Sequence, residues 1–559
     1  MAMHILAGLS VGIALLAAPP SVEREAQVTQ TQQVDKLHGE LAAVLAGAAE
    51  GELIPVTIIM RDQAPPNEIQ QASRLQDKAA RRHAVKSILK AVADGSQKEL
   101  LALLRAGQET GAAGPEIRSL WIHNVVGAEV TAELATQIAA RPDVAYLNHN
   151  KKMGAELFPV EPPGEPPPGP SLAIECGVEL MEAPRVWNEL GITGRGAIIC
   201  VIDTGCCIAH PDLENQIWTN PGEIPGNHVD DDGNGFVDDI NGWNFESNNN
   251  NINDTYGHGT HVSGTVAGDG TNGETTGMAP DCAVMTCKFW NNFGGEQTVW
   301  DGMQYAVDNG AHVTTASLGW PHMMNPDRPT WRAICENTIA AGLVVVYAAG
   351  NEDGWYSPVD NVRTPGDVPD VVTVGATDCS DNLAGFSSTG PVTWQNIPPY
   401  NDWPYPPGKI KPSICAPGVD TLSTSIDNNC TTYERMSGTS MATPHVAGAV
   451  ALILEANPYL DHHGVKDILM NTALDLGPDG FDNQFGMGRV NAYEAVLEAL
   501  ASLPCPGDLD GDGDTDQSDL GVLLADWGCT SGCVGDLDGD DDTDQEDLGI
   551  LLADYGCTP

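Results

Sequence analysis

Apolar runs alternate with helical periodicity over residues 176–500. The clearest apolar runs, residues 197–202, 343–347 and 371–374, are rich in β-branched residues and carry no charge. Strands that are apolar on both faces are typical of a parallel sheet that helices cover on each side. The pattern therefore predicts an α/β domain over residues 174–500, with a mostly parallel sheet and helices on both faces.

The first part of the chain shows a different order of elements. Strand-like runs and helical spacing predict strands at residues 56–60, 117–122, 125–130 and 144–147 and helices at residues 79–104 and 131–140. The order βαββαβ is typical of a small open-sandwich α+β domain, which we place at residues 37–153.

Two further segments flank this small domain. Residues 5–18 form an apolar run that is too short to span a bilayer and that precedes a polar stretch. This pattern predicts a secretory signal peptide over residues 1–25, with a buried helix as the alternative. Residues 159–170 are rich in proline, which predicts an extended, accessible linker over residues 154–173. No later segment is apolar for long enough to predict a membrane span.

The formal charge of −51 lies almost entirely after residue 153. Residues 1–153 hold 15 Lys and Arg against 16 Asp and Glu, whereas the rest of the chain holds 11 against 61. Such a negative surface repels nucleic acid and anionic lipid. We therefore expect neither of them as a partner.

The sequence carries the groups that serine-based acyl transfer needs: a hydroxyl, a base, a carboxylate that orients the base, and oxyanion donors. Asp203 follows the first apolar run, at the carboxyl end of a predicted strand, where open α/β sheets place their sites. His258 and Ser440 each lie in a glycine-rich turn that predicts entry into a helix. Asn351 follows the second apolar run and can donate to the oxyanion beside the Ser440 N–H. Singly, Asp203 and Ser440 could be helix caps, but their joint occurrence with His258 and Asn351 favours a catalytic triad.

The motifs around these residues resemble the three signatures of the subtilisin-like serine proteases, peptidase family S8. Val-Ile-Asp-Thr-Gly at Asp203, His-Gly-Thr-His at His258 and Gly-Thr-Ser-Met-Ala at Ser440 occur in that family's order. Three further stretches agree with the family or with its bacillopeptidase F-like branch: residues 386–391, 411–418 and 218–227. The resemblance implies a secreted serine endopeptidase that hydrolyses protein or peptide substrates through an acyl-enzyme.

The same resemblance implies substrate contacts and a pro-region. The residues implied to bind the substrate are Ser317, Leu318, Gly319, Ala349 and Gly350. The βαββαβ domain resembles the I9-type inhibitory propeptide of these enzymes, which implies a zymogen inhibited by its own propeptide. We expect autocatalytic cleavage between about Lys152 and Cys176, because the linker there is accessible.

Several residues near the motifs are open to more than one interpretation. Asp254 is expected either to line the substrate cleft or to be a solvated loop carboxylate, and His261 and His445 are expected to be structural. Cys206 and Cys207 depart from the family pattern: one of them is a free thiol near the site, or both form disulfides, and a second nucleophile is less favoured. The fourteen cysteines indicate an oxidising compartment. The connectivity of those outside the C-terminal repeat does not follow from the sequence.

The chain ends in two near-identical units, residues 505–529 and 533–557. Each unit has aspartates at alternate positions of a loop that precedes a helix, the oxygen-rich pattern that Ca2+ prefers. The predicted ligands are the carboxylates of Asp508, Asp510, Asp512, Asp516, Asp519, Asp536, Asp538, Asp540, Asp544 and Asp547 and the backbone carbonyls of Asp514 and Asp542. Asp541 stands where the first loop has Gly513, so we expect weaker binding by the second loop.

The repeat at residues 505–557 resembles a dockerin domain, a small all-α calcium-binding fold. This resemblance implies a cohesin-like partner, and with it attachment at the cell surface. Helices are expected at residues 520–527 and 548–555. We also expect disulfides Cys505–Cys529 and Cys533–Cys557, each joining the start of a unit to the end of its helix.

A further acidic loop lies inside the α/β domain. Asp230, Asp232, Asn234 and Asp238 have the spacing of calcium ligands, with Gly235 at the turn. No glutamate ends the loop, so a bare acidic loop is the alternative to a third calcium site.

Three functions compete on the sequence alone. An active secreted endopeptidase is favoured, because every catalytic group is present. The alternatives are a cohesin-binding surface scaffold with an incidental protease fold, and a processing protease with one narrow substrate. The sequence does not separate broad from narrow specificity, because the shape of a pocket depends on how the backbone is placed around it.

Overall fold

The computed structural model describes residues 36–151, 174–289, 295–352 and 359–557. The predicted signal peptide and linker, residues 1–25 and 154–173, lie outside the described residues. The chain divides into two compact units. Of the described residues, the first contains 36–62, 94–119 and 124–150, and the second contains 63–93, 120–123 and those from Lys151 onward.

The first unit is a four-stranded sheet packed against helices. Its strand order is β2-β3-β1-β4, and β1 pairs antiparallel with both β3 and β4. The strands are β1 (Ile54–Met60), β2 (Ala113–Leu120), β3 (Val125–Val130) and β4 (Val144–His149). The helices are α2 (Leu41–Gly47), α5 (Lys98–Thr110) and α6 (Ala132–Ala139). Their apolar faces form one core with the sheet.

The order βαββαβ expected for this region is present, with two differences. The helix expected at residues 79–104 is broken into α4 (Lys78–Ser96) and α5. The break falls at Gln97, whose buried side chain donates to Asn124 Oδ1 at 2.9 Å. The strand expected at residues 117–122 begins earlier and ends at Leu120, because the chain turns before β3.

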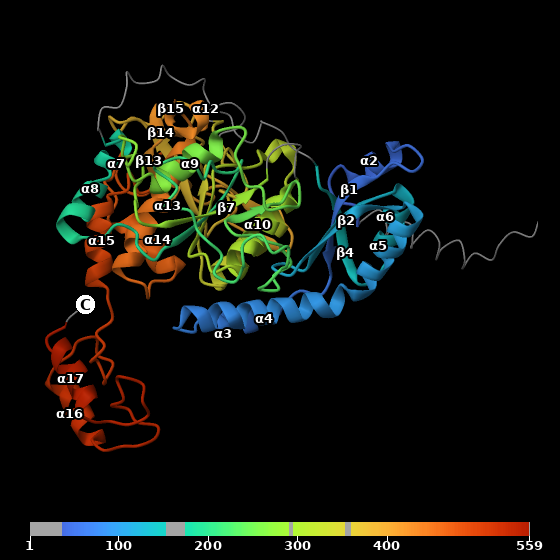
Figure 1. Cartoon of the computed structure of the whole chain (residues 1–559). Helices are drawn as coiled ribbons and strands as arrows, with labels where there is room; N and C mark the ends of the chain where they lie inside the picture. Colours follow the sequence, from blue (N-terminus) through green and yellow to red (C-terminus); the bar gives the residue numbers. More distant parts are fainter. Residues whose placement is uncertain (1–35, 152–173, 290–294, 353–358, 558–559) are drawn as a thin grey trace, which may run out of the picture. The chain divides into compact units, whose positions relative to one another are not determined.

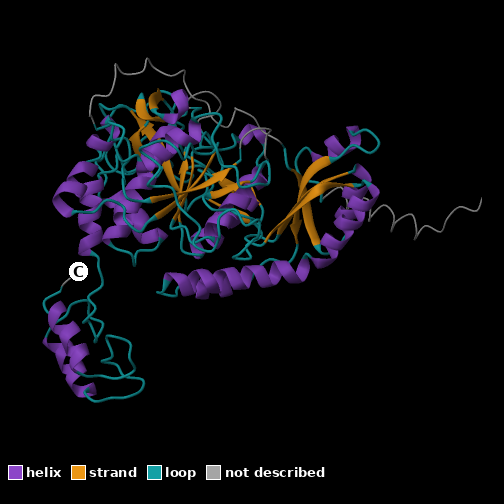
Figure 2. Cartoon of the chain, in the orientation of Figure 1, coloured by secondary structure: helices purple, strands orange, loops and turns teal. Residues whose placement is uncertain are grey.

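The second unit is built on a parallel sheet (Figures 1 and 2). Its seven strands lie in the order β13-β10-β9-β8-β5-β7-β6, and every adjacent pair is parallel. The strands are β5 (Ile198–Asp203), β6 (Gly242–Asn244), β7 (Ala283–Lys288), β8 (Val313–Ala316), β9 (Val344–Ala348), β10 (Val372–Thr377) and β13 (Ile414–Pro417). Two hairpins accompany the sheet: β11 (Trp394–Ile397) with β12 (Tyr400–Asp402), and β14 (Thr421–Ser425) with β15 (Thr432–Met436).

Helices cover both faces of the parallel sheet, as predicted. Val201 of β5 belongs to the core cluster that contains α13 (Thr439–Ala456). The next residue, Ile202, packs against α10 (Glu296–Asp308): a Cβ added at Gly302 of this helix would lie 3.2 Å from the Ile202 side chain. Because successive strand residues point to opposite faces, α13 and α10 lie on opposite faces of the sheet.

Further helices belong to this unit. They are α3 (Pro66–Ala72), α4, α7 (Cys176–Leu180), α8 (Ala183–Arg185), α9 (His258–Ala267), α11 (Arg328–Ala340), α12 (Asp427–Cys430), α14 (His462–Asn471) and α15 (Ala492–Ala501), with η2 (Val186–Leu190) and η3 (His322–Met324). In the described part of the chain, no helix combines the length and apolar character needed to cross a membrane.

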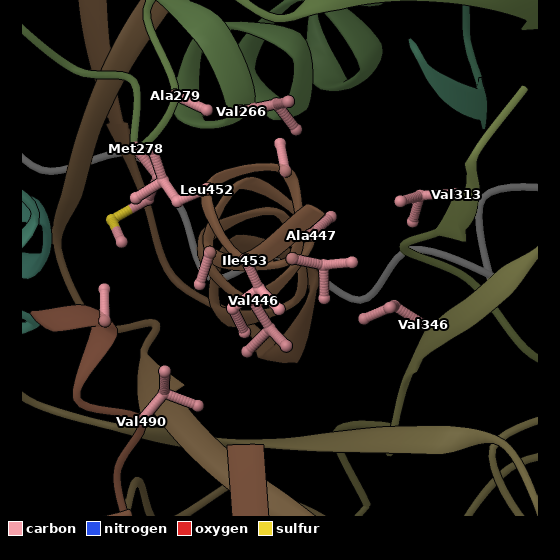
Figure 3. Packing of buried hydrophobic residues seen from close by; sticks show 14 of the residues in the cluster. Val266, Met278, Ala279, Val313, Val346, Val446, Ala447, Leu452, Ile453 and Val490 are labelled. Atoms are coloured by element: carbon pink, nitrogen blue, oxygen red, sulfur yellow. The ribbon is translucent and has the colours of Figure 1, made fainter. Parts of the chain in front are cut away.

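Helix α13 forms the centre of the core (Figure 3). Every residue of α13 except Glu455 is buried. Figure 3 shows Val446 and Ala447 of this helix among side chains from the strands and from α9, including Val346 and Val266. A helix that is apolar on all sides must be surrounded by protein. The helix that carries Ser440 in its first turn is therefore held rigidly.

Residues 505–557 fold as two loop–helix units. Helices α16 (Gln517–Asp526) and α17 (Gln545–Asp554) pack against each other, and Leu523 and Leu551 are fully buried. Each loop donates a backbone N–H to the last aspartate of the other unit's helix. The two loops are therefore joined through both helices rather than each through its own.

This exchange explains why the predicted disulfides of the repeat are wrong. Cys505 pairs with Cys557, and Cys529 pairs with Cys533. The start of each unit lies against the end of the other unit's helix, so the nearest cysteine belongs to the other unit. Their Cα–Cα distances are 5.8 Å and 5.6 Å.

Candidate active site

Three parallel strands bring candidate residues to one edge of the sheet. β5 ends at Asp203, β8 ends immediately before Ser317, and Asn351 follows β9. These strands are adjacent in the order β9-β8-β5, so their carboxyl ends are neighbours. The site thus lies at the edge where parallel sheets of this kind place ligands.

Asp203 and His258 form a buried pair. His258 begins α9, and its Nδ1 lies 2.7 Å from Asp203 Oδ1. The two side chains are 0% and 1% exposed. Gly259 allows this approach, because a Cβ there would lie 2.2 Å from Gly205 O. The pair has the arrangement in which a carboxylate orients an imidazole.

Asp254 holds the turn in front of α9. Its Oδ1 accepts from Thr204 Oγ1 and Gly257 N, each at 3.0 Å, and its Oδ2 accepts from Thr260 N at 2.9 Å. The residue is only 8% exposed. The expectation of a solvated loop carboxylate is therefore wrong. Asp254 instead joins the end of β5 to the start of the helix that carries His258.

Ser440 is the second residue of α13 and is tied to Ser317. Its Oγ donates to Ser317 O at 2.9 Å, and Ser317 Oγ donates to Ser440 O at 2.8 Å. The hydroxyl proton therefore points toward the substrate-binding segment. It must turn before it can be given to His258. The position at a helix N-terminus also favours negative charge at this residue.

Asn351 is oriented by the residue before Ser440. Its Oδ1 accepts from Thr439 N at 2.8 Å and from Thr439 Oγ1 at 2.9 Å. A Cβ added at Gly438 would lie 3.4 Å from Asn351 Nδ2, so the amide nitrogen faces this segment. The sequence analysis missed Thr439, whose role is visible only when the two segments meet.

The implied substrate-binding residues lie on two segments that flank Ser440. Ser317 contacts Ser440 directly. Leu318 and Ala349 are 2% and 0% exposed, so their side chains are not available to a substrate. A Cβ at either Gly319 or Gly350 would lie 2.7 Å from the side chain of Arg363.

Arg363 and Glu352 form a buried ion pair that the sequence analysis missed. Arg363 Nε lies 2.9 Å from Glu352 Oε1 and Oε2, and Arg363 Nη1 donates to Gly319 O at 3.0 Å. Glu352 Oε2 in turn accepts from Asn351 N at 3.0 Å. The ion pair thus links the oxyanion candidate to the substrate segment. No local pattern predicts it, because the two residues lie in separate parts of a loop.

The other histidines and cysteines near the motifs have structural partners. His261 Nε2 lies 3.0 Å from Thr421 O, and His445 Nδ1 lies 2.8 Å from Met441 O, in keeping with structural roles. Burial lowers the pKa of His261 to about 3, so it stays neutral. Cys207 is bonded to Cys430. Cys206 is a buried free thiol, and burial raises its pKa to about 12, which argues against a second nucleophile.

A fourth described disulfide, Cys176–Cys379, joins the start of α7 to the loop after β10. The remaining free cysteines among the described residues are all buried: Cys200, Cys282, Cys287, Cys335 and Cys415. Of the two alternatives for Cys206 and Cys207, the structure has one free thiol, Cys206, and one disulfide, at Cys207.

In the internal acidic loop, backbone hydrogen bonds hold two of the predicted ligands. Asp230 accepts from the backbone of residues 233–235, and Asp238 accepts from the backbone of residues 226–228. Carboxylate oxygens of Asp232, Glu223 and Asp239 lie within 4.8 Å of one another. Asn234 Nδ2 donates to Asp232 and Asp239, so it offers them its amide nitrogen. Burial raises the pKa of Asp239 to about 6.

The two C-terminal loops have matching geometry. Asp508 accepts from the N–H groups of residues 511–513, and Asp536 does the same for residues 539–541. Oxygens of Asp508, Asp510 and Asp512 lie within 4.8 Å of one another, as do those of Asp514, Asp516 and Asp519.

Each of these loops also buries one carboxylate oxygen that has no hydrogen bond. The oxygens are Asp514 Oδ1 and Asp542 Oδ1, at equivalent positions. Desolvation, and after it the neighbouring carboxylates, raises the pKa of both residues. Asp541 has φ 73°, in the left-handed region that Gly513 occupies with φ 101°. An all-oxygen donor set with unsatisfied atoms fits a hard cation such as Ca2+.

Comparison with known proteins places the catalytic unit in a family. The model of the subtilase family, peptidase S8, matches residues 194–488. The major intracellular serine protease of Bacillus subtilis is 32% identical over 280 residues, which cover 50% of this chain and 74% of that protein. Subtilisin Savinase of Lederbergia lenta is 32% identical over 326 residues, covering 58% of this chain and 99% of that protein.

Similarity to a longer relative extends further along the chain. Bacillopeptidase F of Bacillus subtilis is 29% identical over 525 residues, which cover 87% of this chain. This chain spans only 34% of the length of that relative. The family match, the relatives and the parallel sheet with its site at the carboxyl edge agree. The chain therefore belongs to the subtilase family of serine-type endopeptidases.

Proposed function

We propose that this protein is a secreted endopeptidase that uses Ser440 as nucleophile, His258 as base and Asp203 as the orienting carboxylate. The observation that carries the assignment is the buried contact of 2.7 Å between His258 Nδ1 and Asp203 Oδ1. It leaves the other ring nitrogen, Nε2, to take a proton. The rigid start of α13 places Ser440 at the carboxyl edge of the sheet, the edge that also carries Asp203.

The reaction follows from these positions. Ser440 Oγ attacks the scissile carbonyl carbon while its proton passes to His258 Nε2. Asp203 stabilises the imidazolium that results. Asn351 Nδ2 and the Ser440 N–H donate to the oxyanion. The tetrahedral intermediate then collapses, the leaving amine takes the proton from His258, and water hydrolyses the acyl-enzyme by the same steps in reverse.

The proposal includes synthesis as a zymogen. Residues 37–153 form the inhibitory propeptide, and cleavage falls between Lys152 and Cys176. Two observations support this: the pro-region has a separate core, and the similarity to bacillopeptidase F covers 87% of this chain. N-terminal sequencing of the secreted protein tests it. An active species that still carries residues 52–150 covalently would contradict it.

The C-terminal repeat is proposed to bind Ca2+ and to dock onto a cohesin-like partner at the cell surface. Supporting evidence is the paired loop geometry with an unsatisfied oxygen in each loop. When bound, the ion supplies positive charge that offsets the repulsion between the loop aspartates. The internal loop is a further candidate for Ca2+, with Asp230, Asp232, Asn234 and Asp238 as the predicted ligands. Carboxylate oxygens of Glu223 and Asp239 lie within 4.8 Å of those of Asp232.

The decisive test of the catalytic proposal is Ser440→Ala in the full chain. We expect loss of peptide hydrolysis, loss of labelling by an organophosphorus serine reagent, and accumulation of unprocessed precursor. In subtilisin itself, loss of the nucleophile costs about a millionfold in kcat. Hydrolysis by the purified variant at the parent rate would refute the assignment of Ser440 as the nucleophile. A parent chain that binds a cohesin but neither hydrolyses peptides nor reacts with the reagent would support the scaffold alternative.

A further inference from the structure

Residues 63–93 belong to the second compact unit, although they lie between two strands of the first. They form α3 and most of α4. Over residues 78–93, α4 carries five basic side chains and no acidic one: Lys78, Arg81, Arg82, Lys86 and Lys90. This helical insertion is called the basic arm below. The proposed chemistry gives it no role.

The basic arm binds the end of α10. Arg82 Nη2 donates to Ala311 O at 2.6 Å, and Lys86 Nζ forms an ion pair with Asp308. Asp308 is the last residue of α10, and its side chain is 10% exposed. Cations are stabilised at a helix C-terminus by the partial negative charge of its free carbonyl groups. The arm therefore meets charge of opposite sign from both a carboxylate and a helix end.

A second contact adjoins the first. Trp121 N and Ile122 N donate to Gln304 Oε1 of α10 at 2.7 Å and 3.2 Å. Asn337 Nδ2 of α11 donates to Ile122 O at 2.6 Å. Trp121 and Ile122 are 7% and 0% exposed. Residues 120–123 thus add hydrogen bonds and apolar burial beside the electrostatic contact of the arm.

This surface is distant from the candidate catalytic residues along the sheet. Ala311 comes before β8, at the amino end of that strand, whereas Ser317 follows its carboxyl end. Because all strands of the sheet are parallel, the arm meets the edge opposite to the one that carries Asp203 and Asn351. A substrate bound at Ser440 would not compete directly for the arm's contacts.

We propose that the end of α10, with Asp308, Ala311 and Gln304, is a docking surface for a basic helix. In the precursor the occupant is residues 78–93 of the same chain. The contact keeps the pro-region bound after the linker is cut and makes its release sensitive to salt. This inference rests on the proposed zymogen. It adds a hold on the pro-region outside the catalytic cleft.

The salt dependence has a physical basis in the exposure of the ion pair. The side chain of Lys86 is 34% exposed, so dissolved ions screen its attraction to Asp308. After residue 153 the chain holds 61 acidic and 11 basic residues, which adds a longer-range attraction for a cationic helix. Both contributions weaken as ionic strength rises.

The test uses the full chain with Ser440→Ala, so that no proteolysis by the protein itself is needed. A site for an unrelated specific protease is inserted in the linker and cut, and dissociation of the pro-fragment is followed by size exclusion. We expect slow dissociation at low salt. Lys86→Glu should raise the dissociation rate roughly tenfold, because it places like charges together. Sodium chloride at about 0.5 M should raise the rate of the parent and shrink this difference.

Two variants control the experiment. Lys98→Glu makes the same change at an exposed residue of α5 and should leave the rate unchanged. Lys86→Glu combined with Asp308→Lys restores opposite charges and should recover slow dissociation. Equal rates for Lys86→Glu and the parent, or immediate loss of the parent fragment at low salt, would overturn the inference. Since this assay measures binding alone, its outcome is separate from that of the catalytic test.

Discussion

Replacing Glu352 with glutamine removes one charge from the buried ion pair that joins Asn351 to Gly319. Glu352 accepts from Arg363 Nε and from Asn351 N, and Ser388 Oγ lies 3.3 Å from its Oε2. The side chains of Arg363 and Glu352 are only 4% and 11% exposed. The variant therefore leaves a buried guanidinium without its counter-charge.

Two effects follow, one on stability and one on catalysis. Removing one partner of a buried ion pair costs about 3–5 kcal/mol of unfolding free energy. Because glutamine keeps one acceptor, we expect a loss of about 3 kcal/mol. Asn351 also loses part of its backbone anchor. Complete loss of an oxyanion donor costs about 10²–10³ in kcat, so a displaced donor should cost about tenfold. KM should change little, because the amide acts mainly in the transition state.

The assays are urea unfolding and steady-state hydrolysis of one peptide. Glu189→Gln makes the same chemical change in the exposed pair with Arg185 and should leave both measurements unchanged. The double variant Glu352→Gln/Arg363→Met lacks both charges. It should have a higher unfolding free energy than Arg363→Met alone, which leaves the carboxylate buried without its counter-charge. If Glu352→Gln keeps the parent's kcat and unfolding free energy, the ion pair does not position Asn351.

Three further outcomes are expected. Asn351→Ala should lower kcat by about 10²–10³ with little change in KM, and a loss of substrate affinity alone would refute its oxyanion role. Burial alone would raise the pKa of Asp367, but Arg328, His322 and Thr364 together outweigh it and lower the pKa from 3.8 to about 2. The stability that this carboxylate contributes is therefore present above about pH 4 and lost toward pH 2, by about 2 kcal/mol, and Asp367→Asn should remove that part of the acid unfolding curve. Calcium should increase the helical circular dichroism of residues 505–557, and EDTA should reverse the increase. Asp541→Gly should increase the calcium affinity of the second loop, measured by calorimetry. If calorimetry detects no bound ion in the parent or in this variant, the repeat is an acidic spacer and not a calcium site.

Local patterns predicted the elements of the sheet well. The apolar run at residues 197–202 is β5 within one residue at each end, and Asp203 closes it. Continuous apolar runs bounded by turns leave few alternatives to a buried parallel strand. The two C-terminal loop–helix units were also predicted, because each is built from one short stretch of chain.

Interactions between segments far apart in the chain could not be predicted from local sequence patterns. The predicted pairing Cys505–Cys529 was wrong, because α16 and α17 exchange loop contacts. In the internal loop, Asp238 accepts from the backbone of residues 226–228, and Glu223 lies beside Asp232 and Asp239. The spacing of residues within the loop did not predict these contacts.

The sequence by itself determined the family motifs, the strand ends that carry Asp203 and Asn351, and the division into regions of different charge. Each of these depends on neighbours within a few residues. Only the tertiary structure decided that Arg363 and Glu352 support Asn351, and that the basic helix α4 meets Asp308 at the end of α10. Such contacts join residues far apart in the chain, and their distances depend on how the helices and strands pack, which no short stretch of sequence encodes.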